Sequence, residues 1–175
     1  MFQHGASFSA ATFVEGGADL SGTTLKGNHA CFNGTNFTKS GASFNQATFE
    51  YGAAFGWATF ERSASFIGST LAQTAGFSET TFTLTADFRE AKFIGEAKFR
   101  ETTFRRDNDR LPGPVFSLAE FSHRETAVFY KTYLGQALFH NCDVSKVMFS
   151  SVDWRKRKRD GKRMVFEEIV DLTVR

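Results

Sequence analysis

The 175-residue chain has few prolines, few cysteines and no long apolar run, and each shortage excludes a class of protein. Two cysteines, Cys31 and Cys142, cannot build the multi-disulfide framework of small secreted domains. No apolar run approaches the roughly 18 residues of a membrane-spanning helix. The N-terminus also lacks the basic stretch followed by an apolar one that directs secretion. We therefore expect a reducing, cytoplasmic location.

Residue patterns that carry catalysis or bind metals are also scarce. The four histidines are scattered, and only His140 stands at metal-ligand spacing from a cysteine, Cys142. Cys142 is expected to point inward and His140 outward, so a shared metal is not expected. The glycines are spread along the chain instead of forming a phosphate-binding loop, and no spacing suggests a catalytic triad. The sequence predicts neither an enzyme nor a cofactor, and no small-molecule substrate.

Phenylalanine, by contrast, is abundant, and twenty of the 22 phenylalanines fall on one lattice. From Phe8 to Phe104, bulky residues follow at steps of five that alternate with seven or six, and from Phe129 to Trp154 the steps are strictly of five. Two positions before these 26 bulky residues stands Ala in 16 cases and Thr in 5, so the unit is small-x-bulky-x-x. The predicted core stack consists of Phe8, Phe13, Phe32, Phe37, Phe55, Phe60, Phe77, Phe82, Phe88, Phe99 and Phe104.

A step of five matches neither the 3.6-residue period of a helix nor the two-residue period of a strand. It matches a chain that turns a corner once per unit. The small and the bulky residue are two apart, so both point inward from a short extended face, and four faces close a square coil. Counting in fours gives about six coils, which at roughly 4.8 Å each predict a rod of about 30 Å.

These residues resemble the pentapeptide-repeat family, whose pattern centres on Leu or Phe with Ala two positions before it. Matching stretches are Ala-Asp-Leu at 18–20, Ala-Ser-Phe at 6–8, 42–44 and 64–66, and Ala-Lys-Phe at 91–93 and 97–99. The resemblance implies an all-β fold, a right-handed quadrilateral parallel β-helix over residues 2–154. The steps of six and seven depart from the strict family pattern by adding residues at every second corner.

The lattice is interrupted between Phe104 and Phe116, and this segment reads as an inserted surface loop at 105–115. It contains both prolines of the chain and lies at a corner of the kind that carries extra residues elsewhere. Either it is a tolerated insertion, or it contacts a partner. The candidate contact residues are Arg105, Arg106, Asp107, Asp109 and Arg110.

Positive charge is concentrated near the C-terminus. Residues 1–104 contain 7 Lys and Arg against 9 Asp and Glu, whereas residues 105–175 contain 14 against 10. Seven of the nine residues of 155–163 are basic: Arg155, Lys156, Arg157, Lys158, Arg159, Lys162 and Arg163. This run is either a solvated connector or a patch for nucleic acid or anionic lipid, which would supply affinity with little sequence choice.

The last segment, 163–175, abandons the five-residue step and places Phe166, Ile169 and Val170 at helix-like spacing. We expect residues 155–175 to form a basic connector and a short C-terminal helix that caps the rod or pairs two subunits. Outward positions that are polar in the early coils become apolar late in the chain, and this helix could cover them. They are Val115, Val128, Tyr133, Leu138 and Met148.

Two functions from different classes remain open. A packed interior leaves only the outside for function, so the first is a rigid, non-catalytic scaffold that binds another protein, with a homodimer possible. The second follows from the resemblance, because several family members are similar to B-DNA in shape and charge and protect type II topoisomerases such as DNA gyrase. Mimicry over about 30 Å would need roughly 18 negative charges, far more than residues 1–104 carry. The lattice already runs at Phe2, so the chain is either a piece of a larger protein or is closed there by a partner.

Overall fold

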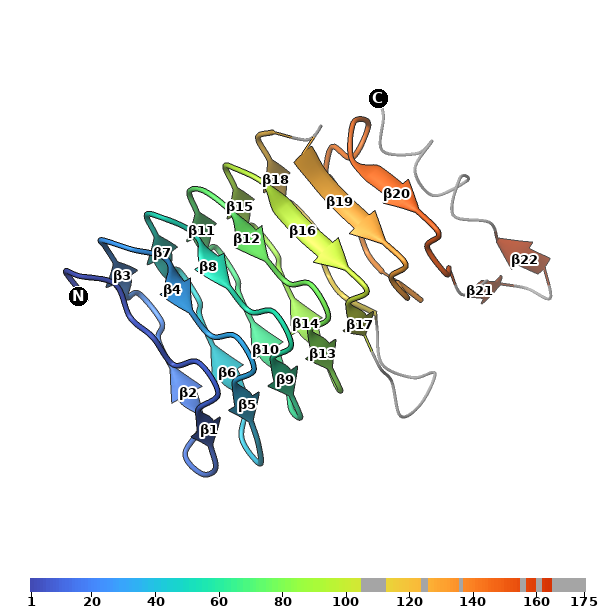
Figure 1. The fold of residues 1–175 in the computed structure, drawn as a ribbon. Helices are drawn as coiled ribbons and strands as arrows, with labels where there is room; N and C mark the ends of the chain where they lie inside the picture. Colours follow the sequence, from blue (N-terminus) through green and yellow to red (C-terminus); the bar gives the residue numbers. More distant parts are fainter. Residues whose placement is uncertain (105–112, 124–125, 136, 155–156, 160–161, 165–175) are drawn as a thin grey trace.

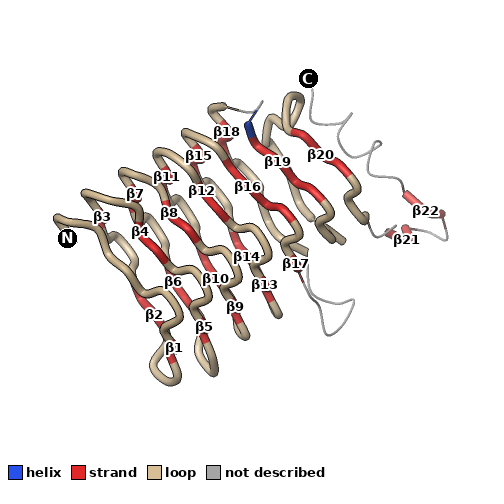
Figure 2. The backbone as a smooth tube through the Cα atoms, viewed as in Figure 1, coloured by secondary structure: helices blue, strands red, loops and turns tan. Residues whose placement is uncertain are grey.

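The computed structural model describes residues 1–104, 113–123, 126–135, 137–154, 157–159 and 162–164, the last two ranges by backbone only. Strands β1 to β20 wind into a parallel β-helix of about six turns with four sheets (Figure 1). Short strands and turns make up almost all of the described chain (Figure 2). The predicted quadrilateral β-helix is confirmed.

Each sheet forms one face of the rod. Face 1 consists of β4 (Ala30–Cys31), β8 (Ala53–Ala54), β12 (Ala75–Gly76), β16 (Ala97–Arg100), β19 (Ala127–Tyr130) and β20 (Met148–Ser150). Face 2 consists of β1 (Thr12–Phe13), β5 (Asn36–Phe37), β9 (Thr59–Phe60), β13 (Thr81–Phe82) and β17 (Thr103–Phe104). Face 3 consists of β2 (Ala18–Asp19), β6 (Ala42–Ser43), β10 (Ala64–Ser65) and β14 (Ala86–Asp87). Face 4 consists of β3 (Thr24–Leu25), β7 (Thr48–Phe49), β11 (Thr70–Leu71), β15 (Lys92–Phe93) and β18 (Glu120–Phe121).

The chain visits the faces in the order 1, 2, 3, 4 in every turn, and the coil advances with a right-handed sense (Figure 1). Neighbouring coils pair in register, so that Ala53 lies against Ala75 and Phe60 against Phe82. Isolated bridges continue the faces into the last coils, where Val115 pairs with Leu138. Because the register repeats the sequence unit, like residues stack on like residues along each face.

The phenylalanine rings stack in columns inside the rod. On face 2 the ring centroids of Phe37, Phe60, Phe82 and Phe104 follow one another at 4.6, 4.9 and 5.0 Å, nearly parallel. Rings from adjacent faces meet edge to face, as Phe55 and Phe66 do at 5.3 Å. Burying each ring contributes roughly 1.5 to 3 kcal/mol, and favourable ring pairing about 0.5 to 1.5 kcal/mol more. The columns are the hydrophobic core.

At two of the four corners, consecutive bulky residues are five positions apart, and the turn between them has the same geometry in successive coils. At the corner from face 1 to face 2, the Ala58 amide donates to the Phe55 carbonyl at 3.0 Å, and Trp57 between them has a φ of 56°. At the corner from face 3 to face 4, Ala91 donates to Phe88 at 3.1 Å around Glu90, whose φ is 58°. A type II turn has this bond and this left-handed residue. The extra residues of the sequence fall at the other two corners.

The late apolar residues lie on different faces. Val128 and Met148 are neighbours on face 1, whereas Val115 and Leu138 are neighbours on face 3. Tyr133 pairs with Thr103 on face 2. Because faces 1 and 3 are opposite sides of the coil, a single helix could cover the apolar positions of one of these faces but not of both.

The basic segment contains a two-stranded antiparallel ribbon. Strand β21 (Arg157–Arg159) pairs with β22 (Lys162–Met164). Arg163 and Met164, the first residues of the segment expected to be helical, therefore belong to a strand. The remaining helix residues, with Phe166, Ile169 and Val170, lie outside the described residues.

Candidate interaction surfaces

Polar groups inside the rod are largely committed to its own backbone. The hydroxyls of Thr35, Thr80 and Thr102 donate to carbonyl oxygens of the preceding coil at 2.6 to 2.7 Å. Cys142 is buried, and burial raises the pKa of its thiol to about 12. His140 is exposed while Cys142 points inward, so these two side chains do not share a site. The described interior therefore offers packing and few groups for chemistry.

The described residues give no support for a metal site or for a membrane-spanning helix. Within them, no three His, Cys, Asp or Glu side chains are placed to hold a metal ion. In the same ranges, no helix has the length and apolar character to span a bilayer.

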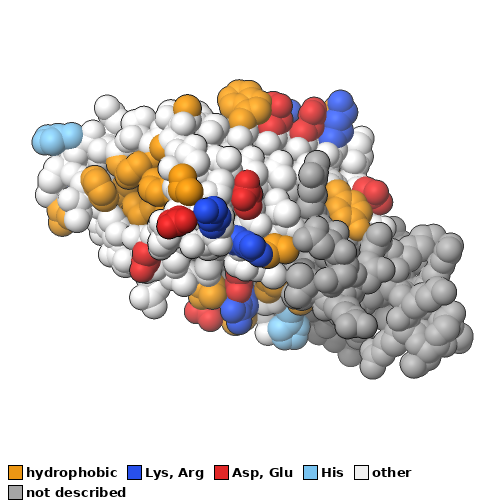
Figure 3. Space-filling model, turned by 90° about the horizontal axis from the view of Figure 1, so that it is seen from below, with side chains coloured by type: hydrophobic (Ala, Val, Ile, Leu, Met, Phe, Trp, Pro, Cys, Tyr) orange, Lys and Arg blue, Asp and Glu red, His pale blue; other side chains and the backbone are white. Residues whose placement is uncertain are grey.

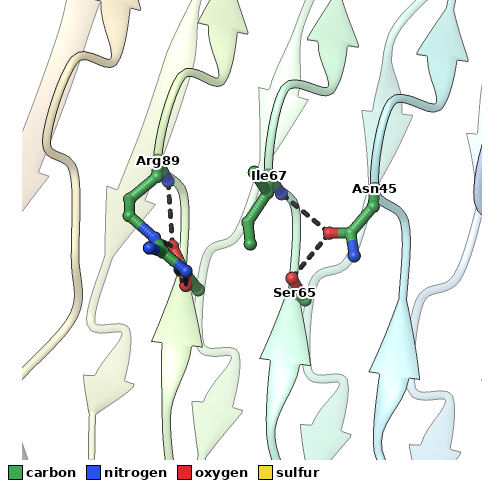
Figure 4. Close-up of polar contacts among 5 residues, drawn as sticks. Asn45, Ser65, Ile67 and Arg89 are labelled. Atoms are coloured by element: carbon green, nitrogen blue, oxygen red, sulfur yellow. Dashed lines mark hydrogen bonds and ion pairs between the residues drawn. The ribbon is translucent and has the colours of Figure 1, made fainter.

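Face 3 carries polar side chains that bond to one another (Figure 4). The Asn45 amide oxygen accepts from the Ser65 hydroxyl at 2.6 Å and from the Ile67 amide at 3.0 Å. One coil further on, Arg89 and Asp87 form an ion pair at 2.7 Å. Because these groups already have partners, the middle of face 3 presents few free donors or acceptors to a ligand.

Charged side chains are mixed on the surface instead of forming a field of one sign. In the view of Figure 3, acidic and basic side chains stand next to one another among uncharged ones. Ion pairs tie neighbouring coils together, for example Lys26 with Glu50 at 3.2 Å and Lys39 with Glu15 at 3.2 Å. An evenly negative rod, as DNA mimicry requires, is not what the described surface presents.

The corner from face 1 to face 2 carries an exposed tryptophan in a fixed position, and we call its residues the Trp57 corner. The equivalent positions of successive coils are Ala10, Gly34, Trp57, Glu79, Glu101 and Lys131. Trp57 is 62% exposed, and its indole N–H donates to the Glu79 carboxylate at 2.8 Å. Glu101 continues the row and pairs with Lys131 at 3.7 Å. On the other side of Trp57, a Cβ atom at Gly34 would meet nothing within 4 Å, so the space next to Gly34 is open.

The backbone that carries Trp57 is held on both sides. Its amide donates to the Ser78 carbonyl at 3.1 Å, and the neighbouring Gly56 amide donates to Asn33 at 2.9 Å. A left-handed conformation costs an L-residue roughly 1 to 2 kcal/mol, and an exposed indole gains no burial energy in return. The same left-handed turn residue recurs in neighbouring coils, as at Glu79 and Glu101, so the conformation belongs to the fold, and the exposed ring is what distinguishes Trp57.

Leu118 provides a comparison at the diagonally opposite corner. It occupies the equivalent turn position between faces 3 and 4, with a φ of 60° and 53% exposure. No hydrogen bond can orient its side chain, since leucine has no polar atom. Trp57 therefore differs from Leu118 in having an oriented ring with an acidic neighbour.

Several residues predicted from the sequence to bind partners cannot be placed. The candidate loop residues Arg105, Arg106, Asp107, Asp109 and Arg110 lie outside the described residues. For the basic run, only the backbone of 157–159 and 162–163 is described. Sequence reasoning missed Trp57 as a surface residue. The signal was present, because it stands two positions after Phe55, where the lattice predicts a turn.

The fold defines a class of architecture: the described chain is a parallel β-solenoid with four sheets, and its small-x-bulky-x-x lattice resembles that of pentapeptide-repeat proteins. No protein-family model matches the sequence, and no curated protein matches it. Among solved structures, the chain is similar to full-length QnrB1, a plasmid-mediated fluoroquinolone resistance protein, with 16% identity and a TM-score of 0.31 over 88% of this chain and 92% of that one.

A second similar structure is HetL, a pentapeptide-repeat protein involved in heterocyst differentiation regulation from the cyanobacterium Nostoc sp.. It shares 16% identity at a TM-score of 0.24, over 91% of this chain and 87% of HetL. These identities and TM-scores carry no argument about partners or activity.

Proposed function

We propose that this protein is a non-catalytic scaffold that binds another protein through the Trp57 corner. The observation that carries the proposal is an exposed tryptophan, with its indole hydrogen-bonded, on a regular turn of the β-helix. Tryptophan is among the residues most enriched at the energetic centres of protein interfaces. A ring already oriented by Glu79 loses little conformational freedom on binding, which lowers the entropic cost of association.

The chemistry of the corner indicates the kind of partner. The indole needs an apolar pocket, and Glu79 and Glu101 next to it favour a rim of Lys or Arg. Regular spacing of the coils, roughly 4.8 Å, would present these side chains in a straight row. We therefore expect a protein with an apolar pocket rimmed on one side by positive charge.

The experiment compares Trp57→Ala with Leu118→Ala. Both changes remove a large exposed side chain from a left-handed turn position, so both have similar effects on the fold. Tagged protein is used to capture partners from cells of the source organism, and these are quantified by mass spectrometry. At least one partner should fall by about tenfold or more with Trp57→Ala, which corresponds to about 1.4 kcal/mol. That partner should be retained by Leu118→Ala.

A partner identified in this way must also bind when purified. Its affinities for the parent, Trp57→Ala and Leu118→Ala must follow the same order as its recovery from cells. Equal recovery of every partner by the parent, Trp57→Ala and Leu118→Ala would contradict the proposal. A complex of the chain with itself that depends on Trp57 would make the partner a second copy.

The alternative function, protection of a type II topoisomerase by DNA mimicry, is not favoured by any observation on the described surface. Residues 1–104 carry 7 basic and 9 acidic side chains, and several of them pair with one another. Attachment to nucleic acid or anionic lipid through Arg155 to Arg163 remains a separate hypothesis. Such binding must weaken steeply between about 50 and 200 mM salt, because counterion release scales with the number of phosphates contacted.

A further inference from the structure

Face 1 changes character along the rod. Its outward positions are small or polar in the early coils, at Ser7, Cys31, Ala54 and Gly76. In the last three coils the pairing in register places Lys98 next to Val128 and Val128 next to Met148. Met148 is 53% exposed in a strand, where an apolar side chain faces water without a partner. We call Val128, Met148 and their neighbour Tyr130 the late patch.

Two cations lie at Tyr130 in the late patch, and one of them, Lys131, also pairs with Glu101 at 3.7 Å. The Arg100 guanidinium lies 5.9 Å from the centre of the Tyr130 ring, and the Lys131 ammonium lies 5.3 Å from it. Arg100 is exposed, and the structure shows no acidic partner for it among the described residues. A segment that covers this patch should therefore combine apolar side chains with carboxylates.

The chain itself contains such a segment, at residues 165–175. It carries Glu167, Glu168 and Asp171 among six apolar residues, and its one basic residue is Arg175. The apolar residues are Val165, Phe166, Ile169, Val170, Leu172 and Val174. Its opposite charge and its apolar content both complement the late patch. Opposing face 3 has apolar Val115 and Leu138, and among the described residues it has no comparable pair of cations around an aromatic ring.

The length of the segment also suits the patch. Eleven residues span about 16 Å as a helix and more if extended. The outward positions Lys98, Val128 and Met148 span two coil spacings, roughly 10 Å. A tethered segment meets its site at an effective concentration on the order of millimolar, so a weak contact suffices to hold it.

We propose that residues 165–175 bind to the late patch on face 1 of their own rod, with the carboxylates directed to Arg100 and Lys131. This covers Met148 and engages Lys131 at the far end of the Trp57 corner, but it does not involve Trp57 or Glu79, so the inference does not rest on the proposed function. It also limits what can bind at this end of face 1, since any partner there must displace the segment.

Disulfide trapping in the full chain tests the proposal. In a Cys31→Ser, Cys142→Ala background, Met148→Cys is combined with Ile169→Cys, and the matched control combines Leu138→Cys with Ile169→Cys. Leu138 is also apolar and late in the chain but lies on face 3. Under mild oxidation, the face 1 pair should cross-link within one chain at least about tenfold faster than the face 3 pair. Intact mass and non-reducing electrophoresis give the readout.

Equal rates for the two pairs, or no cross-link between positions 148 and 169, would overturn the proposal. A disulfide that joins two chains would also overturn it and would assign the patch to a second copy. Arg100→Glu should slow the face 1 cross-link several-fold, whereas Lys92→Glu, an exposed lysine on face 4, should leave its rate unchanged. An unchanged rate with Arg100→Glu would contradict the role assigned to charge.

Discussion

The central coils and the first coil are built from the same sequence unit but differ in burial. Rings from Phe32 to Phe104 are at most 2% exposed, whereas Phe8 and Phe13 are only partly buried and Phe2 is 40% exposed. A central ring is covered by a coil on each side, and a ring in the first coil is covered on one side only. The unit therefore specifies the direction of a side chain, and the neighbouring coils determine how much its burial contributes. This is the nearest-neighbour behaviour expected of a solenoid.

The largest expected effect is a difference in lost stability between two positions of one phenylalanine column. Phe82→Ala should lower the free energy of unfolding by roughly 3 to 5 kcal/mol, because a cavity opens between two covering rings. Phe13→Ala should cost less than half as much, because Phe13 stacks on a single ring of its column, Phe37, at 5.1 Å. Urea denaturation followed by far-ultraviolet circular dichroism measures both. Equal losses would show that the first coil is as well covered as the centre.

Stability measured at alkaline pH should show that the Cys142 side chain is buried in the late coils. The pKa of the Cys142 thiol is raised from about 9 in the unfolded chain to about 12 in the fold. The neutral thiol is thus favoured by folding, and its stabilising contribution is complete below pH 9 and is lost as the pH rises from 9 toward 12.

The parent should therefore lose more stability than Cys142→Ala between pH 8 and pH 10.5. Alanine is the usual residue at this position of the unit, so the variant is a suitable control. Unfolding free energies measured at both pH values give the comparison. Identical losses in the two proteins would mean that the last coils open to solvent.

A smaller effect should distinguish inward from outward threonine in one strand region. Thr80 is buried and donates to the Phe55 carbonyl at 2.7 Å, so Thr80→Val should cost about 0.5 to 1.5 kcal/mol. Thr81 points outward in β13, and Thr81→Val should change stability by no more than about 0.5 kcal/mol. Thermal melts of the two variants measure both changes in stability. Similar shifts in both would argue against the inward hydroxyl ladder.

The smallest effect concerns a corner and should differ in sign between two nearby positions. Glu90 has a φ of 58°, so Glu90→Gly should stabilise the protein by up to about 1 kcal/mol. Lys92→Gly, two residues later in strand β15, should destabilise it by about 0.5 to 1 kcal/mol. Both side chains are exposed, which removes burial from the comparison. Destabilisation by both changes would contradict the left-handed turn assigned to Glu90.

Much of the fold could be predicted because the repeat unit is local and regular. The step between Phe55 and Phe60 already contains a face and a turn, so the inward direction of both rings follows from the spacing. The lattice also indicated which corners carry extra residues. The strands at 157–159 and 162–164 were not foreseen, because a short basic ribbon has no repeat and no apolar alternation to predict it.

The candidate site was less predictable. The loop residues from Arg105 and the basic run from Arg155 were predicted as contact sites, because clustered charges are easy to recognise in a sequence. Trp57 did not stand out among so many aromatic residues. Only the coordinates show its indole bonded to Glu79 with open space beside Gly34.

The sequence by itself determined the inward and outward pattern, the four-sided coil and the absence of an obvious catalytic motif. These depend on residues two to five positions apart, whose relative directions are set by backbone geometry. The tertiary structure decided which outward residues become neighbours, because residues about 22 positions apart meet only when coils stack. Val128 and Met148 share a patch while Leu138, between them in sequence, lies on the opposite side. The surfaces proposed to function therefore depend on the register of coil on coil.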